Sequence, residues 1–537
     1  MINRISCKCF VALALFAAST QAQVEQARLK GTVTDTTGLV IPAARIVVKN
    51  ERTGEERHVE SDANGYYAAR NLAPSTYRLS VSAPGLAAPV YNDVQLAAGQ
   101  ERTINMVMYP EVMGTEINVS GGEMVVVDTG SARIGVNVGA REVGNLPLNG
   151  RQLSQLYLLT PGAVSSGGGS YDNIRFSGRA NQQNVIRYDG VEGSAIVDAS
   201  PGNLNGASSS SFRLQSSLEN VQEFRVESNN YPAEYGTGSG GQITVVTKSG
   251  SNEFHGAVFE YLRNNAMDAR NFFDSERLSP LRMNQFGASL GGPVRKDRAF
   301  FFAAYEGLRQ RAGVNLIETV PSAAARTRAI PAIRPLLAAY PVGSSPTADP
   351  DLDLAQLNRS ATVDENYGSI RLDYRLTPRY SLYTRYFRDQ GYSFDPLGVT
   401  GNSQRFAAIP QNALVSFQQI LTPSLINESK LGVNSYKTRS NGDAPPLAGI
   451  DMNSISVNLA GSVALPGIGG QGGSAGIATA GGLIRSSSAF NGRALPYTNY
   501  SISFIDTLSW VRGNHNFRMG VEIRPIRLYT DRLGGTT

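Results

Sequence analysis

The chain lacks the residues on which several protein classes depend. It has two cysteines among 537 residues, Cys7 and Cys9, and both lie near the N-terminus. Residues 1–22 read as a secretory signal, with a basic start, the apolar run Phe10–Ala18 and small residues at a cleavage site. Removal of this signal leaves a mature chain without cysteine, which excludes disulfides, thiolate metal sites and cysteine nucleophiles.

Long apolar runs and a strong net charge are also missing. After the signal, no stretch of about twenty apolar residues is present, so the sequence predicts no membrane helix. Loss of Arg4 and Lys8 with the signal lowers the formal net charge from +5 to +3. This balance is close to neutral for the length and gives no support for nucleic-acid binding.

Motifs of catalysis and cofactor binding are absent or incomplete. The three histidines, His58, His255 and His515, are isolated from one another, so a zinc site has no support. Gly236–Gly241 has the glycine spacing of a dinucleotide loop, but a β-like run follows it where a helix is needed. Alternating aspartates in residues 349–353 lack the glycine and glutamate of a calcium loop. We therefore predict no cofactor, no metal and no enzyme.

What the sequence does contain is alternation of polarity with a period of two. Between Asn252 and Arg527, about nine segments alternate in this way. Ser501–Val511 and Asn516–Arg524 are the clearest, each with apolar side chains on one face. The polar face would meet water in a soluble sandwich, whereas it would line the lumen of a transmembrane barrel.

The connectors distinguish these two interpretations. Short turns such as Thr377-Pro378 and Thr422-Pro423-Ser424 alternate with gaps of about twenty to sixty residues. Outer-membrane barrels sort their short turns and long loops to opposite sides in this way, and a sandwich has no reason to do so. We predict polar lumen-facing residues, each of which either lines a path or pairs with a plug: Arg371, Asp373, Arg375, Glu428, Lys430 and Arg518.

The region before these segments contains a small β-domain. Residues 28–110 hold short β-like runs separated by turn residues, which is typical of a β-sandwich. The runs Gly31–Asp35, Ile41–Val48 and Leu72–Val81 resemble the carboxypeptidase regulatory-like domain. This resemblance implies a transthyretin-like sandwich, of a class often grouped with carbohydrate-binding folds, and it does not imply peptidase activity.

The middle region resembles a plug. Arg141–Leu159 has helical spacing in places, and β-like runs follow it. Leu146–Leu153, Asn184–Gly190, Asn220–Glu227 and Ala233–Gly250 are similar to the plug of TonB-dependent outer-membrane receptors. With Phe286–Arg295 and the N-terminal sandwich, the arrangement resembles the Oar-like branch of this family.

The resemblance implies a domain order and a coupling segment. We expect a signal (1–22), a sandwich (28–110), a linker (111–122), an α/β plug (123–250) and a partial barrel (251–537). In the linker, Thr115–Ser120 resembles a TonB box, the short segment that adds a strand to the sheet edge of a partner. Its candidate partner-binding residues are Glu116, Ile117, Asn118, Val119 and Ser120, and a strand of the plug is the alternative interpretation.

The predicted function is that of a bacterial outer-membrane TonB-dependent receptor that imports an unidentified external ligand through a plugged barrel. Its expected partners are outer-membrane lipid and a periplasmic TonB-type energy-coupling protein. An Oar-like surface, secretion or adhesion protein is the alternative, and a soluble carbohydrate-binding β-protein is a third class. About nine strands cannot close a barrel of this family, so we also expect the chain to be a fragment.

Overall fold

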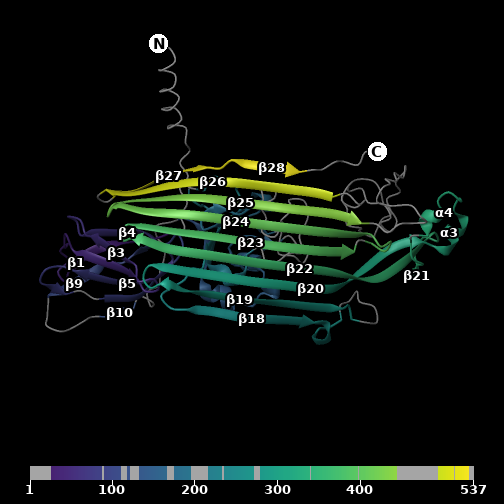
Figure 1. Ribbon diagram of the computed structural model, residues 1–537, viewed down its shortest axis with the longest axis horizontal. Coiled ribbons are helices and arrows are strands. Elements are labelled where there is room, and N and C mark those ends of the chain that lie inside the picture. Colours follow the sequence, from purple (N-terminus) through teal and green to yellow (C-terminus); the bar gives the residue numbers. More distant parts are fainter. Residues whose placement is uncertain are drawn as a thin grey trace, which may run out of the picture.

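The computed structural model describes residues 26–530 except 88–89, 111–117, 121–131, 166–173, 195–215, 233–234, 271–277, 339, 397, 444–493 and 513–514. The expected signal and part of the expected linker therefore lie outside the described residues. A sandwich, a small plug and a broad curved sheet follow one another along the chain (Figure 1). No helix in these ranges is both long and apolar enough to cross a bilayer.

The N-terminal domain consists of two sheets that enclose an apolar core. One sheet has the order β4-β1-β9-β6 with β8 also paired to β1, and the other has the order β10-β7-β5-β2-β3. The strands are β1 (Ala27–Asp35), β2 (Arg45–Asn50), β3 (Glu56–Glu60), β4 (Tyr66–Leu72), β5 (Ser75–Ser82), β6 (Leu86–Ala87), β7 (Val90–Leu96), β8 (Glu101–Thr103), β9 (Met106–Pro110) and β10 (Asn118–Ser120). Leu29, Ile46 and Leu79 are fully buried between the sheets, because alternate residues of each strand point inward.

The last β-like run of the sandwich, for which the sequence predicts one strand over Glu101–Met108, is two strands in the structure. β1 pairs with β8 through Arg28–Lys30 and with β9 through Val33–Asp35. Between these pairings, the Asn105 side chain accepts a hydrogen bond from the backbone N–H of Thr32. This bond takes the place of a backbone hydrogen bond between strands. Strand β7 was also not predicted, and within it Asp93 adopts a positive φ of 56°.

The plug is a five-stranded mixed sheet with short helices. Its strand order is β11-β16-β17-β14-β15, and β12 and β13 form a separate pair. The strands are β11 (Ile134–Val138), β12 (Ala163–Ser165), β13 (Ile174–Phe176), β14 (Val185–Tyr188), β15 (Val191–Glu192), β16 (Val221–Asn229) and β17 (Gln242–Thr247). The helices are α2 (Ala140–Asn145) and the 3₁₀ turns Asn149–Arg151, Leu153–Leu159, Asn181–Gln183 and Leu218–Asn220. The predicted helical stretch 141–159 is thus broken, since Leu146 precedes a proline and is extended.

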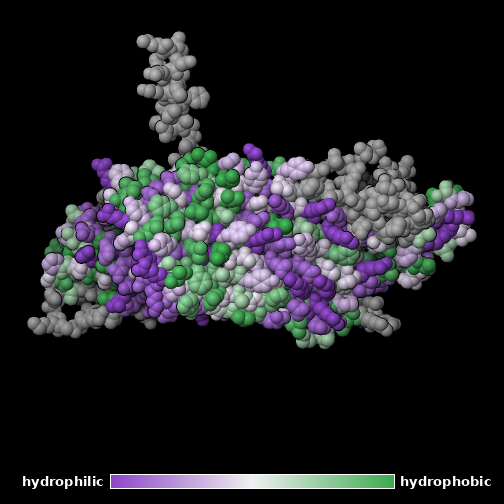
Figure 2. Space-filling view, viewed as in Figure 1, coloured by the Kyte–Doolittle hydropathy of each residue, from purple (hydrophilic) through white to green (hydrophobic). Residues whose placement is uncertain are grey.

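The C-terminal half is an antiparallel sheet of eleven strands in the described residues. Its order is β18-β19-β20-β22-β23-β24-β25-β26-β27, with β21 paired to β22 and β28 paired to β26. The elements are β18 (His255–Asn264), the 3₁₀ turn Asn265–Met267, β19 (Leu281–Arg295), β20 (Ala299–Pro321), α3 (Ala323–Arg328), α4 (Arg334–Leu337), β21 (Ser345–Pro346), β22 (Leu352–Thr377), β23 (Tyr380–Pro396), β24 (Ser403–Thr422), β25 (Leu425–Asp443), β26 (Ala494–Arg512), β27 (His515–Ile523) and β28 (Ile526–Thr530). Its concave face holds the plug, and its convex face carries a band of hydrophobic residues (Figures 1 and 2).

Most barrel strands are longer than the sequence predicts. Alternation of polarity predicts strands that begin at Asn366 and Asn412. The structure starts β22 fourteen residues earlier, at Leu352, and β24 nine residues earlier, at Ser403. Only residues 397–402 connect β23 to β24, where we expected about twenty. The polarity alternation ends where the strands leave the lipid, because both faces are polar beyond that point, so it cannot mark the ends of strands. The predicted mainly-β class, with a sandwich, a plug and antiparallel barrel strands, is confirmed.

Candidate functional site: charged contacts that hold the plug in the barrel

A tight turn at the end of β14 presents a carboxylate to the barrel wall. Asp189 and Gly190 both have positive φ, 48° and 89°, and Tyr188 pairs with Val191 across the turn. Asp-Gly suits a two-residue hairpin of this type, because both residues tolerate left-handed backbone. The Asp189 carboxylate accepts hydrogen bonds from the backbone N–H and the hydroxyl of Thr247, at 2.9 and 2.7 Å. The plug therefore fixes this side chain by itself before any contact with the barrel.

Two barrel arginines converge on Asp189. The Arg385 Nε lies 2.7 Å from its carboxylate, and an Arg371 Nη lies 3.6 Å from it. Burial by itself raises the pKa of Asp189, but the two guanidinium groups and the Thr247 hydrogen bonds outweigh burial and hold this pKa below its ordinary value. Asp189 is therefore ionised, and we call Asp189, Arg371 and Arg385 the plug lock.

The backbone around the same turn is held by neighbouring barrel side chains. Lys430 donates to the carbonyl of Asp189 at 3.1 Å, and Arg385 donates to that of Tyr188 at 3.1 Å. Further donors from β24 and β25 reach the carbonyls of Glu192, Gly193 and Ser194, and these donors are Asn412, Tyr436 and Asn434. The barrel wall thus satisfies backbone groups that the short strand β15 leaves unpaired.

A second charged cluster holds the other side of the plug. Arg151, in a left-handed conformation with φ 53°, pairs with Glu219 at 2.8 Å and approaches Glu306 of β20 at 3.7 Å. Its guanidinium also lies over the rings of Phe259 and Tyr261, with 4.4 and 4.9 Å to the centroids. Glu306 accepts further hydrogen bonds from Ser217 of the plug and Gln285 of β19. We call this group the Arg151 cluster, and it joins the plug to strands β18, β19 and β20.

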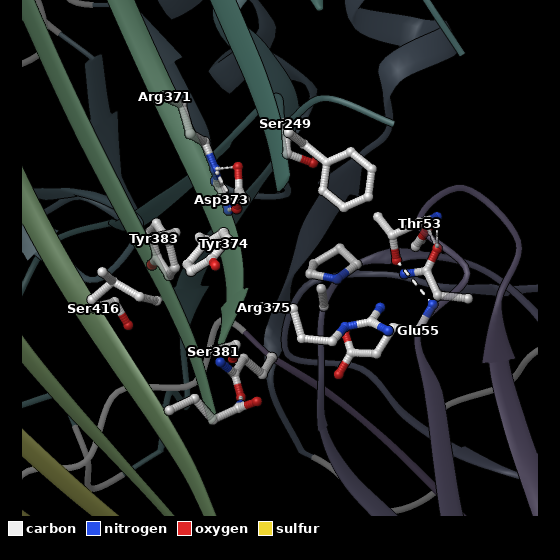
Figure 3. A pocket seen from close by; sticks show the side chains of 18 of the residues that line it. Thr53, Glu55, Ser249, Arg371, Asp373, Tyr374, Arg375, Ser381, Tyr383 and Ser416 are labelled. Atoms are coloured by element: carbon white, nitrogen blue, oxygen red, sulfur yellow. Dashed lines mark hydrogen bonds and ion pairs between the residues drawn. The ribbon is translucent and has the colours of Figure 1, made fainter. Parts of the chain in front are cut away.

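The sandwich contacts the same end of the barrel at which the short turns lie (Figure 1). Gln26 donates to Glu428 at 3.1 Å, Gln418 donates to the carbonyl of Asn71 at 3.3 Å, and Arg70 donates to the carbonyl of Trp510 at 3.3 Å. A cavity of about 170 Å³ lies between the domains. Figure 3 shows the sandwich loop with Thr53 and Glu55 on one side of this cavity and barrel strands with Arg371 and Asp373 on the other.

The candidate TonB box lies partly on the sandwich. Glu116 and Ile117 are outside the described residues, whereas Asn118–Ser120 form strand β10. β10 pairs in parallel with the sandwich edge strand β7, with Asn118 opposite Val90 and Ser120 opposite Asn92. The segment is therefore held as an added strand, which is the kind of pairing that its proposed partner would also offer. β10 is therefore part of a sandwich sheet and not a strand of the plug, which was the alternative interpretation of this segment.

The structure also places the predicted lumen residues. Arg371 and Lys430 contact the plug, and Arg371 also pairs with Asp373 at 2.9 Å. Glu428 contacts the sandwich through Gln26. The lock residues Asp189 and Arg385 and the cluster residues Arg151 and Glu306 were not predicted to have a role. In the sequence, the only signal for Asp189 is an Asp-Gly pair directly after a strand. The only signal for Arg385 is its position in β23, where alternate residues face the lumen.

Other sequence motifs have structural roles. In the Gly236–Gly241 motif, a Cβ on Gly240 would collide with Asn184 and one on Gly241 with the ring of Phe176. Asp351 of the aspartate series pairs with Arg328. Among the residues that the structure describes, no group of three or more His, Cys, Asp or Glu side chains is arranged to hold a metal.

The barrel strands and the sandwich match known families. A family model described as "Outer membrane beta barrel domain" matches residues 246–330 and 325–534, and one described as "Carboxypeptidase regulatory-like domain" matches residues 28–109. The first match covers more than half of the chain. This protein therefore belongs to the outer-membrane β-barrel family, and its place is the outer membrane.

Comparison with individual proteins adds a named relative. The chain is 29% identical over 284 residues to "TonB-dependent transporter Oar" of Myxococcus xanthus, which confirms the Oar-like resemblance. The match covers 49% of this chain and 25% of that protein, so the chain matches about a quarter of the relative's length.

Two solved structures are similar to parts of the chain. The outer-membrane transporter YddB of Escherichia coli is 12% identical with a TM-score of 0.49, over 74% of this chain and 49% of that one. The ferric enterobactin receptor PfeA of Pseudomonas aeruginosa is 14% identical with a TM-score of 0.46, over 77% and 52%. Both likenesses thus extend over about half of the solved chain.

Proposed function

We propose that this chain is the plug-bearing part of a TonB-dependent outer-membrane receptor that imports an external ligand and performs no catalysis. The observation that carries the proposal is the charged contact between plug and wall, in which one plug carboxylate meets two barrel arginines. A permanent structural core gains little from buried ion pairs compared with apolar contacts. Polar contacts suit a plug that must separate from the barrel wall and return, because water can hydrogen-bond to the separated groups in the open state.

In this proposal, strand β10 is the segment on which the energy-coupling protein pulls. A periplasmic energy-coupling protein would pair with Asn118–Ser120 and draw on the chain that leads to the plug. Strand addition uses backbone groups, so the pairing is possible only when β10 has left the edge of β7. The sandwich then competes with the coupling protein for one segment, and its strand β7 holds that segment until the partner arrives.

Substitution of the box tests this assignment in the natural full-length protein. Val119→Pro removes a backbone N–H and should abolish energised accumulation of a radiolabelled ligand found in a screen of metal chelates, oligosaccharides and peptides. Binding of the same ligand to de-energised cells should be unchanged. Val119→Thr keeps the backbone and serves as the matched control. Normal accumulation in the proline variant would refute the proposed coupling.

A second candidate function has one observation in its favour. Strands β20 and β22 pair from Ala299 to Pro321, and their far ends carry α3, α4 and a small apolar cluster of Val320, Ala355 and Val399. This arm projects at the end opposite the sandwich (Figure 1). Such an arm suits contact with another protein, as expected of an Oar-like surface or adhesion protein. Deletion of residues 323–350 would abolish capture of that partner while leaving small-ligand accumulation intact.

A further inference from the structure

A short connection of small residues joins the plug to the barrel. β17 ends the plug at Thr247, and β18 begins the barrel at His255. Between them, residues 249–251 are Ser-Gly-Ser, and we call residues 249–252 the hinge. Any displacement of the plug must change backbone angles here, because this connection is the direct covalent link between the plug and the first barrel strand. Glycine and other small residues suit such a change, since they place few limits on φ and ψ.

One sandwich residue makes hydrogen bonds on both sides of the hinge glycine. Arg52 lies in the turn between β2 and β3, and its guanidinium donates to the carbonyl of Ser249 at 3.2 Å. The carbonyl of Arg52 accepts a hydrogen bond from the backbone N–H of Asn252 at 2.9 Å. Gly250 lies between these two attachments, so the sandwich fixes the backbone before and after it. We call these contacts the Arg52 clamp.

The same sandwich turn also contacts the plug sheet and a barrel turn. The Arg52 guanidinium donates to the side chain of Gln222 on β16 at 3.4 Å. Asn252 exchanges two hydrogen bonds of 2.7 Å with Asp297, in the turn between β19 and β20. Gly54 lies directly against Asp297, because a Cβ on Gly54 would collide with its carboxylate. One turn of the sandwich therefore meets the plug, the hinge and the barrel together.

The turn that carries Arg52 is held in shape by the sandwich itself. The Asn50 side chain accepts hydrogen bonds from the backbone N–H groups of Arg52 and Thr53, at 3.0 and 3.2 Å. Gly54 has a φ of 69°, which glycine adopts without strain. An asparagine that caps its own turn in this way limits the backbone conformations of the turn. The sandwich therefore presents Arg52 to the hinge in one orientation.

The Arg52 clamp is built so that it can release. The hydrogen bonds that the structure describes for the Arg52 guanidinium end on neutral oxygens, of Gln222 and Ser249, and not on a carboxylate. Burial and the nearby positive charge of Arg371 lower the pKa of Arg52, so its charged form is not favoured by this position. Ser249 and Gly250 also line the cavity between the domains (Figure 3), which gives the hinge open space into which it can turn.

We propose that the sandwich is a gate on the plug, and that its Arg52 clamp prevents the hinge from turning until the sandwich leaves. This inference rests on the proposed function, in which the plug separates from its wall and returns. β10 lies between the sandwich and the plug in the chain, so a pull on β10 reaches both domains. The clamp sets the order: the sandwich is drawn away first, and the freed hinge then lets the plug follow. The barrel thus stays closed when no coupling protein is bound.

The first test follows plug movement by the labelling of a buried thiol in the natural full-length protein. Val191 of the plug is fully buried and packs against Leu414 and Ile505 of the barrel, so V191C reacts with a maleimide only when the plug leaves the wall. Any other cysteine is removed, and no denaturant is used, so that the sandwich stays docked. R52A loses the two hydrogen bonds of the guanidinium and should raise the labelling rate about fivefold.

Two further variants calibrate this rate. R52K keeps the charge, but one ammonium group cannot replace the fork that reaches both Gln222 and Ser249, so its labelling rate should be intermediate. R45A removes an exposed arginine at the other end of β2 and is the matched control, which should be labelled at the wild-type rate. Equal labelling rates for R52A, R45A and the wild type would overturn the proposal.

A second test tethers the sandwich to the barrel. A short bifunctional thiol reagent joins N71C to S509C, positions at which the native side chains lie 3.3 Å apart, and proteolysis of the plug is timed without denaturant. With Arg52 present, the tether should slow cleavage of the plug about tenfold, because a tethered sandwich rebinds at high effective concentration. With R52A, most of this protection should be lost. Equal protection with and without Arg52 would show that the clamp does not act on the hinge.

Neither test measures import. A receptor that imports nothing would still give the expected labelling and proteolysis if the Arg52 clamp holds its hinge. Conversely, unchanged labelling in R52A would overturn the gate and leave the proposed coupling through β10 to be judged by the accumulation of ligand.

Discussion

The barrel holds two attached domains by different chemistry. The plug is held by buried ion pairs, with Asp189 against Arg385 at 2.7 Å and Arg151 against Glu219 at 2.8 Å. The sandwich is held to the barrel by hydrogen bonds of 3.1–3.4 Å, two of which end on backbone carbonyls. Weak contacts of the second kind break one at a time, whereas a buried ion pair resists separation until both charges are solvated. The comparison implies that the sandwich separates from the barrel before the plug does.

The largest expected effect comes from the plug lock. Asp189→Asn leaves Arg385 buried without its carboxylate, while Arg371 keeps its pair with Asp373, and it should destabilise plug docking by about 3–5 kcal/mol. Proteolysis of the plug in rising urea, in the full-length protein, measures this change. The double variant D189L/R385M replaces the pair by apolar side chains and should recover part of the loss. An unchanged urea midpoint for D189N would show that the lock contributes nothing.

A smaller loss is expected in the Arg151 cluster. Arg151→Lys keeps the charge but loses the planar contact with Phe259 and Tyr261, which should cost about 1–2 kcal/mol. Proteolysis of the plug in rising urea measures this loss of docking free energy. R309K, on the outward face of β20, is the matched control. A loss as large as that of D189N would mean that the two clusters do not act separately.

Docking of the sandwich on the plug should depend on pH. Glu223 of β16 accepts a hydrogen bond from the backbone N–H of Ala98, beside Asn137 and Arg225, and burial raises the pKa of Glu223 to about 7. A raised pKa favours the protonated, docked form, so this contribution is complete below the ordinary value of 4.5 and is lost as the pH rises through about 7. Proteolytic release of the sandwich should be faster at pH 8 than at pH 5.

The control for this pH effect is Glu223→Gln, which cannot ionise. Release of the sandwich from this variant should be nearly independent of pH between 5 and 8. A wild type and a variant with the same pH profile would assign the effect to other groups.

The smallest effect is expected at the contact of sandwich and barrel. Gln418→Ala removes its hydrogen bonds with Arg57, with the Gln26 side chain and with the Asn71 carbonyl. Because water can replace these part-buried bonds, the net cost should be about 0.5–1 kcal/mol. The substitution should speed release of the sandwich and leave the urea midpoint of the plug unchanged. A shift in that midpoint would contradict the independence of the two contacts.

The sequence predicts some parts of this structure and misses others for physical reasons. Alternation identifies the lipid-exposed parts of the barrel strands, and the β-like run expected directly after Gly241 is strand β17, Gln242–Thr247. Alternation cannot mark where β22 or β24 ends, because the contrast between lipid and lumen stops at the membrane surface. Pairing of Asp189 with Arg385 depends on how the plug is seated in the barrel, which no local pattern encodes. The same is true of β10, whose place on the edge of β7 depends on the path of the linker.

The most direct test of the coupling account traps β10 on the sandwich. The mature chain is expected to have no cysteine, so Asn92→Cys with Ser120→Cys gives one pair at matched register across β7 and β10. Binding of a purified periplasmic TonB-type domain to the full-length protein is then measured before and after reduction. The account predicts little binding by the oxidised form and full recovery on reduction, with N92C alone unaffected. Equal binding by the oxidised and reduced forms would contradict it.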